Sequence, residues 1–295
     1  MSVAVRPTPP SRRRIQLSRR SRRRVGTIAL STGIAALALV WMSPMYLVFV
    51  NSLKDFGAIL RNAAAIPDPV VTENYRVAWE LADFTTALAN SLFVTVLAVG
   101  GLVIIGAMAA WRMARRPHRW HKVLFSLFIV AMVVPFQTLM IPTVQLATWL
   151  NIVNTRTGLV LLYLSFGMPL TVFFLHGFVQ SSVPREIEEA ARIDGASSWQ
   201  TFRLVVLPLM RPMIATVSIL HAFWIWNDFL LPLLVLFDPS RRTIPLAIFS
   251  FFGVHSDQWD LATAALIMGM VPIVIFFLVF QRFIISGVAA GSLKG

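Results

Sequence analysis

The residues with the clearest capacity for chemistry lie in one polar segment, 183–208, which separates two long apolar runs. Pro184 suits the first turn of a helix, and the three glutamates that follow it lie at the positive end of that helix's dipole. Gly195 suits the left-handed conformation that ends many helices. A second short helix over 197–206 runs into Pro208. The segment therefore predicts a helix–glycine–helix elbow near a membrane surface.

The first helix of this elbow carries residue types that suit docking rather than bond making. Ala190 and Ala191 are small, so the surface of another protein can approach the helix backbone closely. Glu188 precedes Arg192 by four residues, which is the favoured order for an ion pair along a helix. An ordered connection between two membrane spans is the simpler interpretation, and these residues alone leave both open.

A second constellation surrounds Asp228, the one carboxylate inside an apolar run. Such a carboxylate costs on the order of 2.5–3.5 kcal/mol on insertion scales, so it is expected to face the interior of a helical bundle. His221, Trp224 and Asp228 fall on one face of a continuous helix, and Asn227 adjoins them. A tryptophan ring beside polar groups suits a sugar. Packing between helices is the alternative, because polar groups also hold membrane helices together.

The rest of the sequence offers no further chemistry. It contains no cysteine and no phosphate-binding loop of the form G-x-x-x-x-G-K-[ST]. It also shows no spacing typical of metal ligands or of a nucleophile with its base. We therefore expect no catalysis, no metal and no cofactor in this chain, so any energy for its work must come from a partner or an ion gradient.

The composition is typical of a membrane protein, because 57% of the residues are apolar and only 13% are charged. We predict an all-α polytopic bundle with about six transmembrane helices. A disordered Arg-rich tail over 1–24 precedes the transmembrane domain 25–285, in which 181–212 form the loop with the elbow, and a short tail over 286–295 follows. The six apolar runs are 25–50, 88–111, 123–146, 158–179, 213–237 and 261–283.

The distribution of positive charge predicts the orientation. The net charge is +13, but the Lys and Arg residues flank apolar runs, which favours a role in membrane topology over nucleic-acid binding. Twenty lie in the tails and loops on the side of the N-terminus, and six lie on the other side. Both termini and the elbow are therefore expected in the cytoplasm. Ser11–Arg14 resembles an export signal, but the apolar run that follows is long enough for an uncleaved span.

The elbow also carries a family resemblance. Glu189-Ala190-Ala191, Gly195, Val205 and Leu207-Pro208 stand at the spacing of the "EAA" signature of ABC importer permeases, with Val205 where that family usually has Ile. The resemblance covers about residues 25–295. Segments that resemble the carbohydrate branch, and within it the smaller permease of the maltose-type importer, are Asn51–Lys54, Thr72–Tyr75, Asn90–Ser91, Trp226–Asp228 and the C-terminal Gly287–Gly295.

This resemblance implies a type I importer fold in a bacterial inner membrane and a specific set of partners. These are a second homologous permease, an external solute-binding protein, a sugar, and a cytoplasmic ATPase dimer that binds ATP and Mg²⁺. The C-terminal tail would reach the ATPase interface. The residues that the resemblance assigns to ATPase coupling are Glu189, Ala190, Ala191, Asp194, Gly195, Leu207 and Pro208.

Two other classes of protein stay open at this point. A proton- or sodium-coupled carrier would need interior carboxylates and inverted repeats, and only Asp228 is clearly interior. A membrane anchor without transport is disfavoured by six spans together with the elbow signature.

Overall fold

The computed structural model describes residues 13–116, 118–252 and 258–292, with the helical backbone alone for 13–26, 29 and 282–292. Every regular element within these residues is a helix. Five helices are long and apolar enough to cross a membrane, and a bent pair brings the number to six. The elements that form these spans are α1 (Arg13–Asn51), α4 (Phe84–Arg115), α5 (Arg119–Val133) with α6 (Phe136–Trp149), α7 (Arg156–Ser182), α10 (Leu207–Asn227) and α13 (Trp259–Ser292).

The core of the bundle is the pair α4 and α7, which make the most extensive contact between any two helices of the described chain. Glycine allows this close approach. A Cβ atom built on Gly106 of α4 would lie 2.4 Å from Cγ2 of Thr171, and one on Gly167 of α7 would lie 2.7 Å from Leu102. Small residues at such contacts let membrane helices pack backbone to backbone. α10 packs against both helices and completes a three-helix core.

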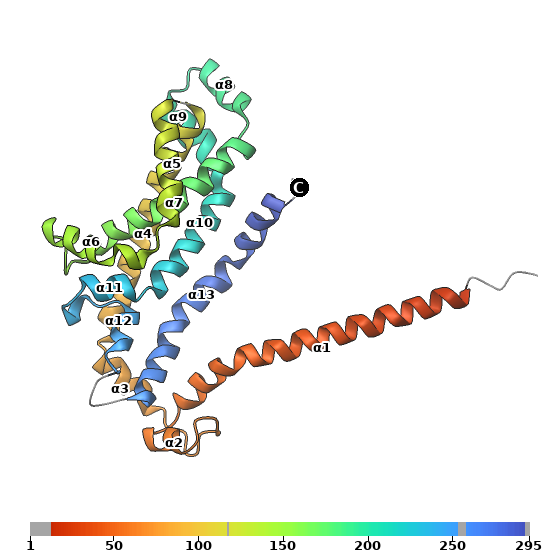
Figure 1. The fold of residues 1–295 in the computed structure, drawn as a ribbon, viewed down its shortest axis with the longest axis vertical. Helices are drawn as coiled ribbons and strands as arrows, with labels where there is room; N and C mark the ends of the chain where they lie inside the picture. Colours follow the sequence, from red (N-terminus) through yellow and green to blue (C-terminus); the bar gives the residue numbers. More distant parts are fainter. Residues whose placement is uncertain (1–12, 117, 253–257, 293–295) are drawn as a thin grey trace, which may run out of the picture.

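Helix α1 lies apart from this core, and it contacts the bundle through α13, near the C-terminal end of α1 (Figure 1). Most of its described apolar side chains are exposed, with Trp41 at 76%, whereas Val50 at the C-terminal end is buried. The helix begins at Arg13, twelve residues before the predicted first span, so the structure differs from the predicted disordered tail over the last part of 1–24. Arginine is a good helix former, and a helix extends readily once nucleated. Residues 1–12 lie outside the described residues.

The third predicted span is not one helix. α5 ends at Val133, α6 begins at Phe136, and the two axes are bent by 110°. Pro135 explains the break, because proline disfavours helical geometry in the residue before it and has no N–H for the helix ladder. The prediction of a continuous helix over 123–146 is therefore wrong, although the pair together still forms a candidate span.

The fifth predicted span is displaced at both ends. The helix begins at Ser198 and runs through α9 (Ser198–Gln200) and the wide-turned segment Thr201–Val206 into α10, so Pro208 does not break it. The N–H of Leu207 donates to the carbonyl of Phe202, five residues back. A turn of this width leaves room for the proline ring, which in an ordinary helix clashes with the carbonyl four residues earlier.

At its other end the fifth span stops at Asn227, before Asp228. The Asp228 backbone is extended, and its Oδ1 atom accepts a hydrogen bond from the N–H of Leu230 at 3.1 Å. A short helix, α11 (Leu230–Val235), follows at an angle. The predicted single helix over 213–237 is thus wrong, because a side chain that bonds to the backbone two residues later offers the chain an alternative to the helix.

The segment between α1 and α4 forms an ordered cap at one end of the bundle. It contains α2 (Phe56–Arg61) and α3 (Glu73–Leu81), and α3 begins after Thr72, whose side chain makes no cap bond. Asn74 donates to the carbonyls of Ser52 and Lys54 at 3.0 and 2.7 Å. The segments that resemble the carbohydrate branch here therefore hold the cap to the end of α1.

At the C-terminus, α13 continues as a helix through Ser292. Most of the predicted C-terminal tail is thus helical backbone, and 293–295 lie outside the described residues. Two short elements that precede α13 are the turn Pro239–Arg241 and α12 (Ile244–Phe249).

Candidate functional site

The first half of the elbow forms as its residues predict. Helix α8 (Arg185–Ile193) starts directly after Pro184 and projects from the end of the bundle (Figure 1). Gly195 has φ +85°, the left-handed conformation expected of a helix terminator. The N–H of Ala196 then donates to the carbonyl of Ala191 at 2.9 Å, so one carbonyl of the last helical turn has a hydrogen-bond partner.

One glutamate of α8 is buried and fixes the helix to α4. The Glu188 side chain is 2% exposed, and its Oε1 atom accepts from Arg115 Nε at 2.7 Å. Its Oε2 atom accepts from Trp111 Nε1 at 3.0 Å. Arg115 Nη2 also donates to the carbonyl of Val183 at 2.6 Å. The carboxylate and the guanidinium thus compensate each other where little water reaches them.

Sequence reasoning missed this contact. The expected partner of Glu188 was Arg192, which the structure places 4.0 Å away with a side chain that is 53% exposed. Arg115 stands 73 residues earlier in the chain, so no local pattern links it to Glu188. The available signal was that Arg115 ends an apolar run at the same predicted membrane side as the elbow.

The signature residues of α8 point away from the bundle. The side chains of Glu189, Ala190, Asp194 and Gly195 are exposed, and Ala191 is half-buried. Ile193, one turn beyond the alanines, is 86% exposed. α8 therefore has one face fixed by Glu188 and an opposite face of small, acidic and apolar residues that no other part of the described chain covers.

The last two signature residues lie elsewhere. Leu207 and Pro208 are half-buried at the start of α10, so they do not extend the exposed face of α8. The segment just before them packs into the bundle through Phe202, whose ring lies 5.3 Å from Trp111 and 5.8 Å from Trp199. Leu207 and Pro208 therefore lie at the junction between the elbow and the fifth span.

A second region is a cavity of about 510 Å³ between the break in the third span, α7 and α10. Three of the four predicted ligand residues, His221, Trp224 and Asp228, line it together. Tyr163 Oη donates to Asp228 Oδ2 at 2.9 Å, and the Trp224 ring meets Tyr163 edge-on at 5.5 Å. Gln137 also lines the cavity.

His221 and Asn227 are placed differently from Trp224 and Asp228. His221 is 1% exposed, and its Nε2 atom lies 2.7 Å from Thr171 Oγ1, so little of its surface reaches the cavity that it lines. Asn227 does not join the group. Its amide donates to the Phe223 carbonyl of its own helix at 2.8 Å, and it lines a separate cavity of about 310 Å³ with Trp226 and Gly269. Asn227 stands six helical positions after His221, and at about 100° per position this leaves the two side chains about 120° apart around α10.

Across the ranges that the structure describes, no group of three or more His, Asp or Glu side chains is placed to hold a metal ion.

Comparison with known proteins gives concordant results. The family model described as "Binding-protein-dependent transport system inner membrane component" matches residues 102–289. The starch degradation products transport permease AmyC of Thermoanaerobacterium thermosulfurigenes is 36% identical, over 88% of this chain and 93% of its own length. The melibiose/raffinose/stachyose import permease MelC of Bacillus subtilis is 34% identical, over 92% and 99%.

The fold has solved counterparts as well. A chain in the crystal structure of a bacterial ABC transporter for the acidic polysaccharide alginate superposes with a TM-score of 0.75 at 20% sequence identity. The match covers 88% of this chain and 96% of that chain.

Proposed function

The chain belongs to the family of binding-protein-dependent transport system inner membrane components, and from this premise we propose that it is the permease subunit of an ATP-driven sugar importer. It spans the inner membrane several times, with both termini in the cytoplasm. Its cargo is an oligosaccharide or disaccharide, the class for which the relatives above and the trehalose permease SugB of Mycobacterium tuberculosis are named.

The observation that carries the proposal is the exposed face of α8. A helix that projects from the end of a membrane bundle with Glu189, Ala190 and Ile193 free is a surface for a partner. The partner is a cytoplasmic ATPase dimer that binds ATP and Mg²⁺, because the chain has no phosphate-binding loop of its own. A second permease subunit and an external solute-binding protein complete the importer.

The opposite face of α8 supplies the route by which movement would reach the membrane. When the ATPase pair closes, it displaces α8, and the Glu188–Arg115 pair passes that displacement to the end of α4. α4 and α7 are packed too closely to slide freely, so they move as a unit. Rigid-body tilting of this unit would alternate the access of the translocation path between the two sides of the membrane.

The cavity beside the broken third span is the proposed sugar contact. Trp224 is 39% exposed and offers a ring on which a sugar can stack. The Asp228 carboxylate, which Tyr163 and Leu230 hold in place, also lines the cavity, where a sugar hydroxyl can donate to it. At about 510 Å³ the cavity has the size of typical ligand pockets.

Reconstitution tests the proposal as a whole. The permease, its sister subunit and the ATPase are placed in liposomes with the solute-binding protein outside, and uptake of a labelled oligosaccharide is followed. We expect uptake to require ATP inside and to survive an uncoupler. Uptake that stops with the uncoupler and ignores ATP would instead indicate an ion-coupled carrier.

A pair of neighbouring variants tests the cavity. Trp224→Ala removes the stacking surface, and we expect the sugar uptake of the same liposomes to fall about ten-fold while assembly with the ATPase is unchanged. Asn227→Ala is the control, because this residue lies on the same helix but faces the other cavity. Equal uptake by the two variants would remove the cavity from the transport path.

A further inference from the structure

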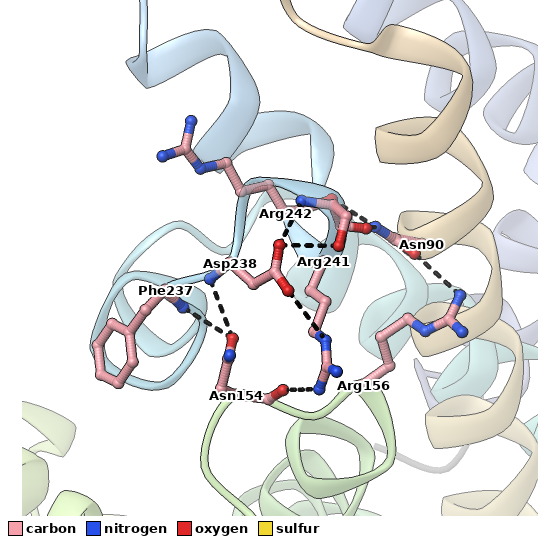
Figure 2. A network of polar contacts seen from close by, with 8 residues as sticks. Asn90, Asn154, Arg156, Phe237, Asp238, Arg241 and Arg242 are labelled. Carbon is pink, nitrogen blue, oxygen red and sulfur yellow. Dashed lines mark hydrogen bonds and ion pairs between the residues drawn. The ribbon is translucent and has the colours of Figure 1, made fainter.

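A pocket of about 440 Å³ lies where the loop before α7 meets the turn Pro239–Arg241. We call it the outer arginine pocket. Two guanidinium groups, those of Arg156 and Arg241, stand beside it (Figure 2). The residues that line it are Phe93, Thr155, Arg156, Thr157, Ser240 and Arg241.

Its position follows from α7, which begins at Arg156 and ends at Ser182 beside α8. A helix of 27 residues is about 40 Å long, which is enough to cross the hydrocarbon core of a membrane. The pocket therefore lies at the end of the bundle opposite α8. If α8 faces the ATPase, the pocket faces the side from which sugar is delivered.

The walls of the pocket are held by amide side chains. Asn90 Nδ2 donates to the carbonyls of Ser240 and Arg242 at 3.0 Å each, which ties the turn to α4. Asn154 Oδ1 accepts from the N–H groups of Phe237 and Asp238 at 3.1 and 3.0 Å. These bonds, drawn in Figure 2, join three segments that are far apart in the sequence, so the pocket is formed before any partner arrives.

The positive charge of the pocket is only partly compensated. Arg156 Nη1 donates to the neutral Asn90 Oδ1 at 3.1 Å, and its guanidinium lies 5.2 Å from the Phe93 ring centre. Within the described residues Arg156 has no carboxylate partner in an ion pair. Arg241 has one, Asp238, at 3.6 Å.

The single acid cannot balance both arginines. The hydroxyl and the N–H of Ser240 hold the pKa of Asp238 below its usual range. Asp238 is therefore ionised and contributes one negative charge against the two arginines. The guanidinium of the adjacent Arg242 points away from the other two (Figure 2). One positive charge in excess therefore faces the pocket.

From this arrangement we propose that the outer arginine pocket receives a carboxylate side chain of the solute-binding protein. The proposal rests on the proposed function, which places that protein at this end of the bundle. A guanidinium presents a planar set of donors that matches a carboxylate, and four of the five N–H groups of Arg156 have no hydrogen bond to another described residue. A protein partner fits better than a headgroup in the membrane, because the pocket is built mainly from the first turn of α7, Thr155 before it and the turn Pro239–Arg241, and only Phe93 comes from within a span.

Charge pairs at the rim of an interface mainly affect the rate of association and its dependence on salt. The test therefore measures binding rather than transport. The permease complex is held in phosphatidylcholine nanodiscs, and the dissociation constant of its solute-binding protein is measured at about 50 mM and about 300 mM NaCl. We expect Arg156→Gln to weaken binding about five-fold at low salt, and Arg156→Glu to weaken it further. In both variants the salt dependence should be shallower.

Arg61→Gln is the matched control, because it removes an exposed arginine from α2 at the same end of the bundle. We expect its binding to stay within about two-fold of the wild type. Arg156→Lys keeps the charge without the planar donors, and it should bind better than Arg156→Gln. This partial recovery would show that the loss in Arg156→Gln comes from the missing charge and not from misfolding.

Three results would overturn the proposal. They are unchanged binding in Arg156→Gln, an equal loss in Arg61→Gln, and a loss that appears only when phosphatidylglycerol is added, which would assign the pocket to an anionic lipid. A wild-type complex that binds the solute-binding protein but imports no sugar would contradict only the proposed function.

Discussion

The two ends of α7 are fixed by opposite chemical means. At its C-terminal end, α8 is held to α4 by one buried carboxylate and its arginine, which are 2% and 7% exposed. At its N-terminal end, the loops are held by the neutral amides of Asn90 and Asn154, and the arginines beside them keep their charge. A buried ion pair resists separation strongly, because either partner alone is costly. A frame of amides holds its shape while leaving charge available to a partner.

This difference indicates different tasks. The end with the internal ion pair is suited to transmit movement, because a force on α8 reaches α4 through a contact that is expensive to break. The other end is suited to recognition, since the amide bonds fix the shape of the pocket before a partner binds. The charge of Arg156 is not neutralised by a carboxylate of the described chain. Variants at each end should therefore differ in how stability and transport respond.

The largest effect is expected for Glu188→Ala. It leaves Arg115 buried without a partner, which should cost about 3 kcal/mol in stability and abolish ATP-driven uptake. Thermal unfolding of the purified complex and liposome uptake measure the two effects.

Glu186→Ala removes an exposed acid of the same helix and should change little. The double variant Glu188→Met with Arg115→Met should recover much of the stability, because a well-packed apolar pair often replaces a buried ion pair without loss. If Glu188→Ala were as stable as Glu186→Ala, the buried pair would not hold α8.

A smaller effect is expected for Asn90→Ala, at the other end. This variant loses two donated hydrogen bonds and one accepted from Arg156, which should cost about 2 kcal/mol in the same unfolding measurement. Asn227→Ala, whose amide bonds only within its own helix, should cost much less. Equal costs would show that the amide frame does not stabilise the turn.

Gly195→Ala should lower stability by about 1 kcal/mol, because only the left-handed backbone opposes the new methyl group. No atom lies within 4 Å of the position that a Cβ would take. Gly177→Ala is the control, because it adds a methyl group into similar open space within an ordinary helix, where alanine is favoured over glycine, and it should raise stability by up to about 1 kcal/mol. A normal unfolding temperature for Gly195→Ala would mean that the turn adapts without strain.

The smallest change in stability belongs to Glu189→Gln. This side chain is exposed, so the free energy of unfolding should stay within about 0.5 kcal/mol of the wild type. Uptake and co-purification with the ATPase should nevertheless fall, since the proposed docking face loses its acid. Full transport by an intact Glu189→Gln complex would refute the docking role of Glu189. The proposed difference between Glu188, which holds α8, and Glu189, which contacts the ATPase, would then be lost.

Three expectations that came from local residue patterns agree with the structure. The run 158–179 lies within α7, α8 starts after Pro184, and Gly195 adopts the left-handed conformation. Helix length, proline at a helix start and glycine at its end depend on neighbours in the chain, which a sequence displays directly. At Pro135 and Asp228 the predicted continuous helices were wrong, because the prediction followed the length of the apolar run and gave too little weight to a proline and to a side chain that bonds to the nearby backbone.

By itself the sequence determined that this is a helical membrane protein, that it carries an elbow with a left-handed glycine, and which family the elbow resembles. Only the tertiary structure decided that Glu188 rather than its neighbour is buried, that Asn227 faces a different cavity from Trp224, and that Asn90 holds a loop 150 residues away. The physical reason is that charge, length and periodicity are local quantities. The partner of a buried polar group depends on which helices pack together, and neighbouring residues in the sequence do not determine that packing.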